Sequence, residues 1–276
     1  MPSFFAASVR RSPVAWLIGL VALLYAWNLG RVELSVTDET RSGMIVRDML
    51  EGNVVLPRTP DGYLSEKPPA YYGTVSLLGL LFGVNEWTLR GVSVLASLAT
   101  LALTARIVRF FGPPRAAALA VAALASNILF LTAARQALVD MMLTLFLTAG
   151  FAGYVAGRLG RISAEAATAI CGLSFGLAVL SKGPLGLALP IAVCGGDFLL
   201  ETRCRFWLVR RPWAPVFGTI LLALAVSALW YLPGLALGRG EFLETSILSE
   251  NFRMPMGAAE GIGVAHFKPP YYYAMW

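Results

Sequence analysis

Seven stretches of the chain are dominated by apolar residues over roughly the length of one membrane crossing. A helix needs about 20 apolar residues to cross roughly 30 Å of hydrocarbon. A backbone in lipid must satisfy its own hydrogen bonds, and the alternation of a barrel strand is absent, so each stretch predicts a helix. The predicted spans are Val14 to Leu29, Trp87 to Val108, Arg115 to Leu131, Gln136 to Val155, Ala166 to Leu180, Leu185 to Leu200 and Pro215 to Leu237.

Two shorter patterns lie between the first and second spans. Tyr71 to Val84 is apolar but shorter than a crossing, which predicts a helix lying at the outer surface. Thr37 and Asp38 can cap another short helix, which Gly52 and Asn53 would end. We expect its apolar residues to lie on the membrane; they are Met44, Ile45, Met49 and Leu50.

Composition and charge fix the class and the orientation of the chain. Hydrophobic residues make up 57% of the chain and charged residues 14%, with a mean hydropathy of +0.68, which is typical of a polytopic membrane protein. The positive-inside rule assigns one set of short, arginine-rich loops to the cytoplasm. The net charge of +6 therefore reflects topology and attraction to lipid head groups, and it does not indicate nucleic-acid binding. The arginines of these loops are Arg10, Arg11, Arg106, Arg109, Arg115, Arg158, Arg161, Arg203, Arg205, Arg210 and Arg211.

The long, mixed-charge segments 31–86 and 238–270 then face outward, so a site built from them is external. The predicted fold class is all-α: a polytopic helical bundle forming one module over residues 1–276, with short amphipathic helices in the first outer segment. The chain stops at aromatic residues around Trp276 that look like the start of a further span, so we expect a partial chain. Its cysteines map to spans or the cytoplasmic face, and no disulfide is expected; they are Cys171, Cys194 and Cys204.

Candidate chemistry lies in the first outer segment. Asp38 and Glu39 would stand at a helix start, where the dipole keeps a carboxylate ionised and suited to act as a base. The alternative is that Asp38 is only a helix cap. Glu66 and Lys67 precede two prolines that stiffen the backbone, as an ion or phosphate site would require. The alternative is a set of ordinary loop charges.

The second outer segment and one span break add further candidates. Arg253 is a second candidate phosphate ligand, or an ordinary loop charge. His266, the sole histidine, would form an incomplete metal site with Glu66, for which substrate phosphate or water would supply the remaining ligands. Lys182 divides an apolar run and either snorkels to the surface or lines the cavity.

Together these residues resemble the lipid-linked-sugar glycosyltransferases of the GT-C fold. The resemblance is to the branch with the protein O-mannosyltransferases and the aminoarabinose transferase that modifies lipid A. No single motif is specific, but their order and approximate spacing run through the whole chain. The matching residues are Asp38-Glu39, Glu66-Lys67-Pro68-Pro69 with Tyr71-Tyr72, Leu89-Arg90, Ala134-Arg135 with Asp140, Lys182-Gly183-Pro184, Glu250-Asn251 and His266.

The resemblance implies roles for these residues. Asp38, with Glu39 beside it, matches the catalytic carboxylate. Lys67 matches the residue that binds the donor phosphate, and we expect Arg253 and Tyr71 to assist it. Glu66 and His266 match ligands of a divalent metal, Zn or Mg. We also expect outer-loop acids to bury three arginines, Arg41, Arg90 and Arg135, if the site is preorganised.

The implied reaction is the transfer, with inversion, of a sugar from a polyprenyl-phosphate donor to an acceptor. The acceptor is a lipid A-like glycolipid or a protein. We expect the site on the periplasmic face of a bacterial inner membrane, since the activated donor outside the cytoplasm must be a lipid. Two alternatives stay open: a transporter or flippase of lipid-linked substrates, and a non-catalytic assembly subunit.

Overall fold

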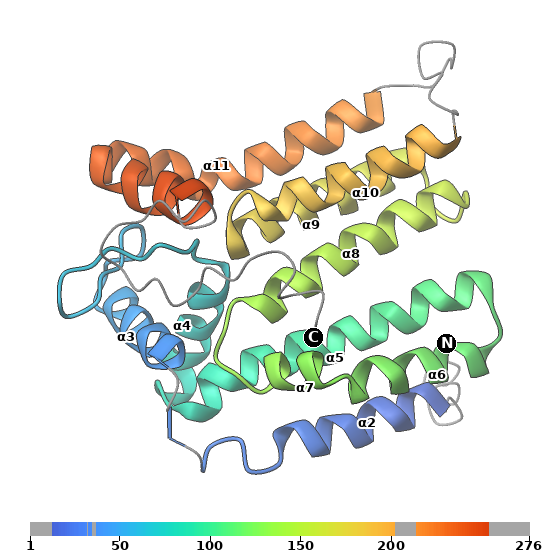
Figure 1. The fold of residues 1–276 in the computed structure, drawn as a ribbon, viewed down its shortest axis with the longest axis horizontal. Coiled ribbons are helices and arrows are strands. Elements are labelled where there is room, and N and C mark those ends of the chain that lie inside the picture. Colours follow the sequence, from blue (N-terminus) through green and yellow to red (C-terminus); the bar gives the residue numbers. More distant parts are fainter. Residues whose placement is uncertain (1–12, 32, 35–36, 202–213, 254–276) are drawn as a thin grey trace.

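The computed structural model describes residues 13–31, 33–34, 37–201 and 214–253, and these residues are mostly helical (Figure 1). Within them the only strand-like pairing is an isolated bridge between Arg58 and Leu64. The all-α prediction is confirmed. The elements are α2 (Pro13–Ala26), α3 (Thr37–Leu50), α4 (Ala70–Phe82), α5 (Glu86–Phe111), α6 (Pro114–Ser126), α7 (Ile128–Ala134), α8 (Asp140–Arg158), α9 (Ala164–Lys182), α10 (Leu185–Glu201), α11 (Ala214–Phe242) and the π-helical segment η2 (Leu243–Arg253).

The long helices run side by side, and the two short helices α3 and α4 lie together at one end of them (Figure 1). The first residues of α5 and α8 and the last residues of α9 and α11 are at that same end. The turns between α5 and α6 and between α8 and α9 are at the opposite end; Arg109 and Arg115 flank the first turn, and Arg161 lies in the second. The described parts of the two mixed-charge segments thus lie at the same end of the bundle, as the predicted sidedness requires.

Four of these helices are long and apolar enough to cross a membrane: α5, α8, α9 and α11. The bent pair α6 and α7 would make a fifth span, and α2, α4 and α10 are shorter apolar helices. The chain is therefore a multi-pass membrane protein. Helices occur at all seven predicted places, while the total of seven crossings stays a prediction.

The predicted span Arg115 to Leu131 is broken, contrary to expectation. The helix α6 ends at Ser126, and α7 leaves it at an angle of 71°. The side chain of Asn127 accepts hydrogen bonds from the N–H groups of Leu129, at 3.0 Å, and Phe130, at 3.2 Å. Because an N-cap side chain replaces the missing partners of the first turn, it begins a new helix inside an apolar run.

Most of the apolar face of α3 packs on protein and not on the membrane, which corrects the prediction for Ile45 and Met49, while Met44 is 37% exposed. Ile45 and Met49 are 1% and 5% exposed, and Val46 is fully buried. They join the main apolar core with residues of α2, α4 and α5. The end of α3 is as predicted, since Gly52 adopts a φ of +114° that favours glycine. The helix is thus held at a fixed position at this end of the bundle.

The predicted surface helix is present as α4. It buries one face, which includes Tyr71, Tyr72 and Val75, against the protein. Its other face is exposed, with Leu77 and Leu81 more than two-thirds accessible. The helix therefore connects the core beneath α3 to an apolar outer surface.

Small residues allow the close packing of α8, α9 and α11. A Cβ at Gly150 or Gly153 of α8 would lie 2.1 Å from Phe175 or 2.5 Å from Ile170, both on α9. On the other side of α9, a Cβ at Gly176 would lie 2.6 Å from Val226 of α11. Membrane helices that approach this closely associate through van der Waals packing.

Substituting Gly186 by Ala is expected to destabilise the fold, because α10 crosses α9 in direct backbone contact there. A Cβ at Gly186 would lie 2.3 Å from the backbone of Ala178 and Val179. Forcing the two backbones apart costs about 1–3 kcal/mol. Thermal unfolding followed by tryptophan fluorescence should show a lower Tm for Gly186→Ala. Gly195→Ala, on the same helix with nothing within 4 Å, should match the unmodified protein; equal Tm values for both variants would contradict this packing.

Candidate active site

A pocket of about 650 Å³ lies at the end of the bundle that carries α3 and α4. Its walls come from four parts of the chain: α3, the segment that leads into α4 with the start of that helix, the turn before α8, and the region around the end of α11 and the start of η2. Charged residues of both signs face it. The lining residues are Asp38, Arg41, Ser42, Ile45, Thr59, Gly62, Tyr63, Leu64, Ser65, Glu66, Lys67, Tyr72, Leu138, Val139, Glu241, Glu244 and Thr245.

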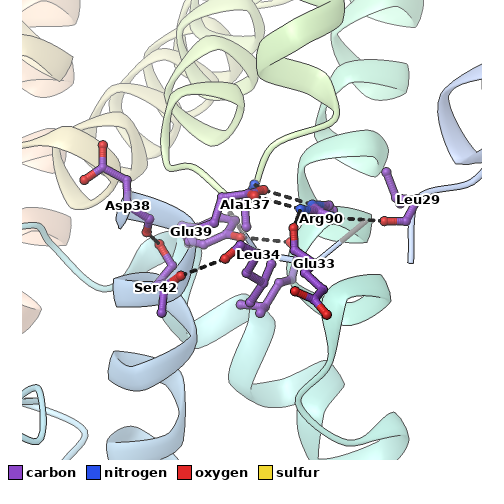
Figure 2. Close-up of polar contacts among 11 residues, drawn as sticks. Leu29, Glu33, Leu34, Asp38, Glu39, Ser42, Arg90 and Ala137 are labelled. Atoms are coloured by element: carbon purple, nitrogen blue, oxygen red, sulfur yellow. Dashed lines mark hydrogen bonds and ion pairs between the residues drawn. The ribbon is translucent and has the colours of Figure 1, made fainter. Parts of the chain in front are cut away.

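Asp38 stands in the first turn of α3 and lines this pocket. Figure 2 shows its carboxylate pointing away from Arg90, on the opposite side from the neighbouring Glu39. Its backbone carbonyl accepts a hydrogen bond from Ser42 Oγ at 2.8 Å, which holds the first turn together. Asp38 is thus the carboxylate of α3 that would meet a molecule bound in the pocket, while its role as a base stays a prediction.

Glu39 is turned into the protein and forms a buried ion pair with Arg90 of α5 (Figure 2). The side chains of Glu39 and Arg90 are 2% and 6% exposed. Glu39 accepts from Arg90 Nε at 2.9 Å and Nη2 at 2.7 Å, and also from the N–H of Ala137 at 2.7 Å. Arg90 in turn donates to the carbonyls of Leu29 at 2.9 Å and Glu33 at 3.2 Å. The pair thus joins α3, α5, the chain before α3 and the turn before α8.

These contacts set the protonation state of Glu39. Burial acts to raise the pKa of Glu39, but the hydrogen bonds from Arg90 and the Ala137 N–H, with the charge of the guanidinium, outweigh burial. They hold the pKa below its ordinary value. Glu39 is accordingly ionised at neutral pH and fully engaged, so its place in the site is beside Asp38 and outside the lining of the pocket.

Glu66 and Lys67 line the wall of the pocket that the segment before α4 provides. Glu66 lies 3.7 Å from Arg41 of α3, in a pair whose side chains are 22% and 47% exposed. Lys67 makes no ion pair with the part of the chain that the structure describes. The structure therefore brings Asp38, Glu66 and Lys67 to one pocket, as the sequence suggested, and adds Arg41 as a second cation.

Tyr71 is not in a position to contact a phosphate, which corrects its expected role. Its side chain is fully buried, and its hydroxyl donates to the carbonyl of Leu89 at 2.8 Å. The adjacent Tyr72 lines the pocket instead. The sequence could not distinguish the two tyrosines, because successive residues of a helix point in directions about 100° apart and its register was unknown.

The three arginines expected to pair with outer-loop acids behave differently. Arg90 is buried against Glu39, as predicted, and Arg41 is half-exposed beside Glu66. Arg135 is partly exposed and pairs with no acid among the described residues; its Nη1 and Nη2 donate to the carbonyls of Leu24 and Trp27, each at 2.8 Å. It therefore stabilises the end of α2.

Two predicted ligands cannot be placed at the pocket. Arg253 is the last residue of η2, but its side chain is outside the described part of the chain, and so is all of His266. The described residues contain no group of three or more His, Cys, Asp or Glu that could hold a metal ion. Metal binding by Glu66 stays a prediction.

Sequence reasoning missed two ion pairs at this end of the bundle. Arg58 and Glu241 form a bidentate pair, with Nη1–Oε1 at 2.7 Å and Nη2–Oε2 at 2.6 Å. Lys182, at the end of α9, donates to Asp140, at the start of α8, so each charge also complements its helix dipole. The Lys182–Asp140 pair had a signal, since Lys182 follows the span predicted to end at Leu180 and Asp140 stands near the start of the span predicted to begin at Gln136. The first had none, because Arg58 and Glu241 are far apart in the sequence.

Comparisons with known proteins agree with this geometry. Undecaprenyl phosphate-alpha-4-amino-4-deoxy-L-arabinose arabinosyl transferases of Pectobacterium carotovorum and Shewanella sediminis are 30% and 29% identical, over 77% and 76% of this chain. Each match covers 38% of the relative. The crystal structure of ArnT from Cupriavidus metallidurans bound to undecaprenyl phosphate superposes with a TM-score of 0.73 at 25% identity, covering 86% of this chain and 44% of that chain.

The chain thus spans less than half the length of each of these three proteins. The fold is the predicted GT-C type, and the predicted resemblance to lipid-linked-sugar glycosyltransferases is confirmed. The sequence profile of one family covers residues 15–239, from α2 nearly to the end of α11. By this match the chain belongs to the dolichyl-phosphate-mannose-protein mannosyltransferase family.

Proposed function

We propose that this protein is a membrane glycosyltransferase that moves a sugar from a polyprenyl-phosphate donor to an acceptor at the outer face. One observation carries the proposal: a carboxylate, Asp38, and two cations, Arg41 and Lys67, line the same pocket. Those are the groups that transfer from a phosphate ester needs. We infer the class of donor from the relatives named above. The acceptor is a glycolipid or a protein.

The groups that line the pocket can carry out the whole transfer. Asp38 takes the proton from the hydroxyl or amine of the acceptor. The freed electron pair forms a bond to the anomeric carbon of the sugar, from the side opposite the phosphate. The bond between that carbon and the phosphate oxygen breaks, and its electrons stay on the phosphate. The products are the glycosylated acceptor, with inverted configuration, and polyprenyl phosphate.

The two cations would stabilise the charge that grows on the departing phosphate. Lys67 offers a compact charge, while the planar fork of Arg41 can bind two phosphate oxygens. Cations and hydrogen-bond donors that point at a developing charge, in a site that excludes water, often make the largest single contribution to catalysis. Glu39 and Arg90 take no part in bond making and hold the first turn of α3 in place.

The position of the pocket suits a lipid donor. Asp38, Glu66 and Lys67 lie at the end of the bundle that the positive-inside rule assigns to the outer face. We propose that this face is the periplasmic side of a bacterial inner membrane. Nucleotide sugars are absent there, whereas the phosphate of a polyprenyl donor sits at the level of the lipid head groups.

The test is transfer of radiolabelled sugar to a total membrane extract by the full-length protein in nanodiscs. Undecaprenyl-phosphate aminoarabinose and polyprenyl-phosphate mannose would be compared as donors. Label in a glycolipid or in a protein band would identify the acceptor class. No transfer from either donor, with a positive control enzyme active, would contradict the proposal and favour the transporter or the assembly subunit.

Lys67→Ala is expected to lower the rate of transfer by roughly tenfold to a hundredfold, since a hydrogen bond to a charged group contributes about 1.5–3 kcal/mol. Lys67→Arg should keep part of the activity, because it keeps the charge. Arg47→Ala is the matched control: it also removes one positive charge, but Arg47 is exposed on α3 and does not line the pocket. A rate for Lys67→Ala equal to that of Arg47→Ala would contradict a role for Lys67 at the phosphate.

A further inference from the structure

Ser65 links the candidate phosphate ligand Lys67 to two other parts of the outer face. It is 3% exposed, and each of its three polar groups has a partner. Its N–H donates to the carbonyl of Pro57 at 2.9 Å, and its Oγ donates to the carbonyl of Lys67 at 3.0 Å. Its own carbonyl accepts from Ser246 Oγ at 3.1 Å. A chain of hydrogen bonds therefore runs from η2 through Ser65 to the backbone of Lys67.

Two neighbours constrain the backbone of Lys67: Ser65, through the hydrogen-bond chain, and the proline that follows Lys67. Pro68 follows Lys67 directly, and it restricts the backbone of the residue before it. The carbonyl of Lys67 is held by Ser65 Oγ. Since both neighbours constrain this peptide, the direction in which the Lys67 side chain leaves the backbone depends on the position of Ser65.

Ser246 is itself held firmly. It is 2% exposed and follows the pocket residues Glu244 and Thr245. The chain enters η2 through a kink at Arg239, whose φ of +44° is unusual for a residue other than glycine. Phe242, at the end of α11, is fully buried in an apolar cluster with Leu64, Leu180 and Trp230.

Two further contacts bind the first outer segment to α11. Trp230 Nε1 donates to the carbonyl of Val55 at 2.9 Å, and Arg58 pairs with Glu241. The wall that carries Lys67 is thus attached to α11 and η2. Asp38, in contrast, stands on α3, whose position depends on the Glu39–Arg90 pair. The wall with Lys67 and the wall with Asp38 therefore have different buried supports, although Arg41 of α3 also pairs with Glu66 at 3.7 Å.

We propose that Ser246 and Ser65 are positioning residues, which set Lys67 against the donor phosphate through the hydrogen-bond chain Ser246–Ser65–Lys67. The inference rests on the proposed function. It adds that the second outer segment controls the affinity for the donor, without contact between Ser246 and the reacting atoms. Disturbing the hydrogen-bond chain should weaken donor binding and the stabilisation of the departing phosphate, and it should leave proton removal by Asp38 intact.

Ser246→Ala tests this inference, since it removes the donor to the Ser65 carbonyl. Loss of one buried hydrogen bond changes an equilibrium by about three- to tenfold. We expect KM for the donor to rise by about that factor, and kcat to fall by no more than the same factor, since Lys67 also faces the charge that grows on the departing phosphate. The Kd for undecaprenyl phosphate, titrated into the full-length protein, should rise in parallel. Ser65→Ala breaks the next bond of the chain and should give the same pattern.

The matched control is Ser227→Ala on α11. Ser227 is also buried, at 7% exposed, but its Oγ donates to the carbonyl of Ala223 within the same helix at 2.7 Å. This variant should leave KM, kcat and Kd unchanged. Ser246→Thr keeps the hydroxyl and should restore most of the donor affinity, which a loss of fold stability alone would not explain.

Each outcome decides the inference. A raised KM and Kd in both Ser246→Ala and Ser65→Ala, with rescue by Thr, would support it. Wild-type KM and Kd in these variants, with wild-type activity intact, would overturn the inference and leave the proposed function standing. A wild-type protein that neither binds undecaprenyl phosphate nor transfers sugar would overturn both.

Discussion

Asp38→Asn is expected to abolish measurable sugar transfer while leaving the fold intact. Asparagine has the shape of aspartate but cannot accept the proton of the acceptor, and loss of a general base costs about 10²- to 10⁴-fold in rate. The contact that steadies the first turn of α3 uses the backbone carbonyl of residue 38, so it survives the substitution. The measurement is the initial rate of label transfer from the donor to the acceptor at saturating donor.

Asp61→Asn is the control for this substitution. Asp61 is an exposed acid of the same outer segment, and it does not line the pocket. Its variant should transfer sugar at the wild-type rate, so a general effect of lost negative charge is separated from a loss of the base. Binding of undecaprenyl phosphate should be retained in both variants. Equal transfer by Asp38→Asn and the unmodified protein would remove the catalytic assignment and leave Asp38 as a helix cap.

The helical elements were predictable because an apolar run in a membrane protein has few alternatives to a helix. The gathering of Asp38, Glu66 and Lys67 was also predictable, since segments on the same side of the membrane end at the same face. The membrane topology predicts that these residues lie close together, and the order of the motifs predicts their roles. The pocket itself then confirmed which of these side chains share a space.

Two of the errors, at α3 and at the break after α6, have related physical causes. An apolar surface packs as readily against other helices as against lipid tails, so a periodic pattern identifies a buried face without naming what covers it. For this reason Ile45 and Met49 were assigned to the membrane, although they lie in the protein core. The break at Asn127 shows a similar limit. The side-chain cap of one residue begins a new helix inside an apolar run that composition alone predicts to be one continuous helix.

Contacts between residues that are distant in the sequence were also not predicted. Nothing local in the sequence pairs Arg58 with Glu241 or Ser65 with Ser246, and both contacts depend on the kink at Arg239 after a long span. Arg90 was different: an arginine at the start of an apolar helix needs a counter-ion, and the outer-loop acids were the nearest candidates. The choice of Glu39 over Asp38 still required the direction of each side chain.

Glu39→Gln is expected to destabilise the protein by about 3–5 kcal/mol at neutral pH, the usual cost of breaking a buried pair on one side. Glutamine can still accept from the Ala137 N–H, but it leaves the Arg90 guanidinium buried without its counter-charge. Thermal or denaturant unfolding in detergent, followed by tryptophan fluorescence, measures the loss. Glu33→Gln is the control, because the side chain of Glu33 is exposed and only its carbonyl meets Arg90.

The pH dependence gives this prediction its sharpest test. The folded pKa of Glu39 is depressed, so the stabilisation is complete above the unfolded value of about 4.3 and is lost as the pH falls through the folded value. The difference in unfolding free energy between the unmodified protein and Glu39→Gln should therefore stay constant from neutral pH to about pH 5, and it should shrink below about pH 4. A difference that persists unchanged at low pH would mean that Gln acts through packing, and that the charge of Glu39 does not hold Arg90 and the first turn of α3 in place.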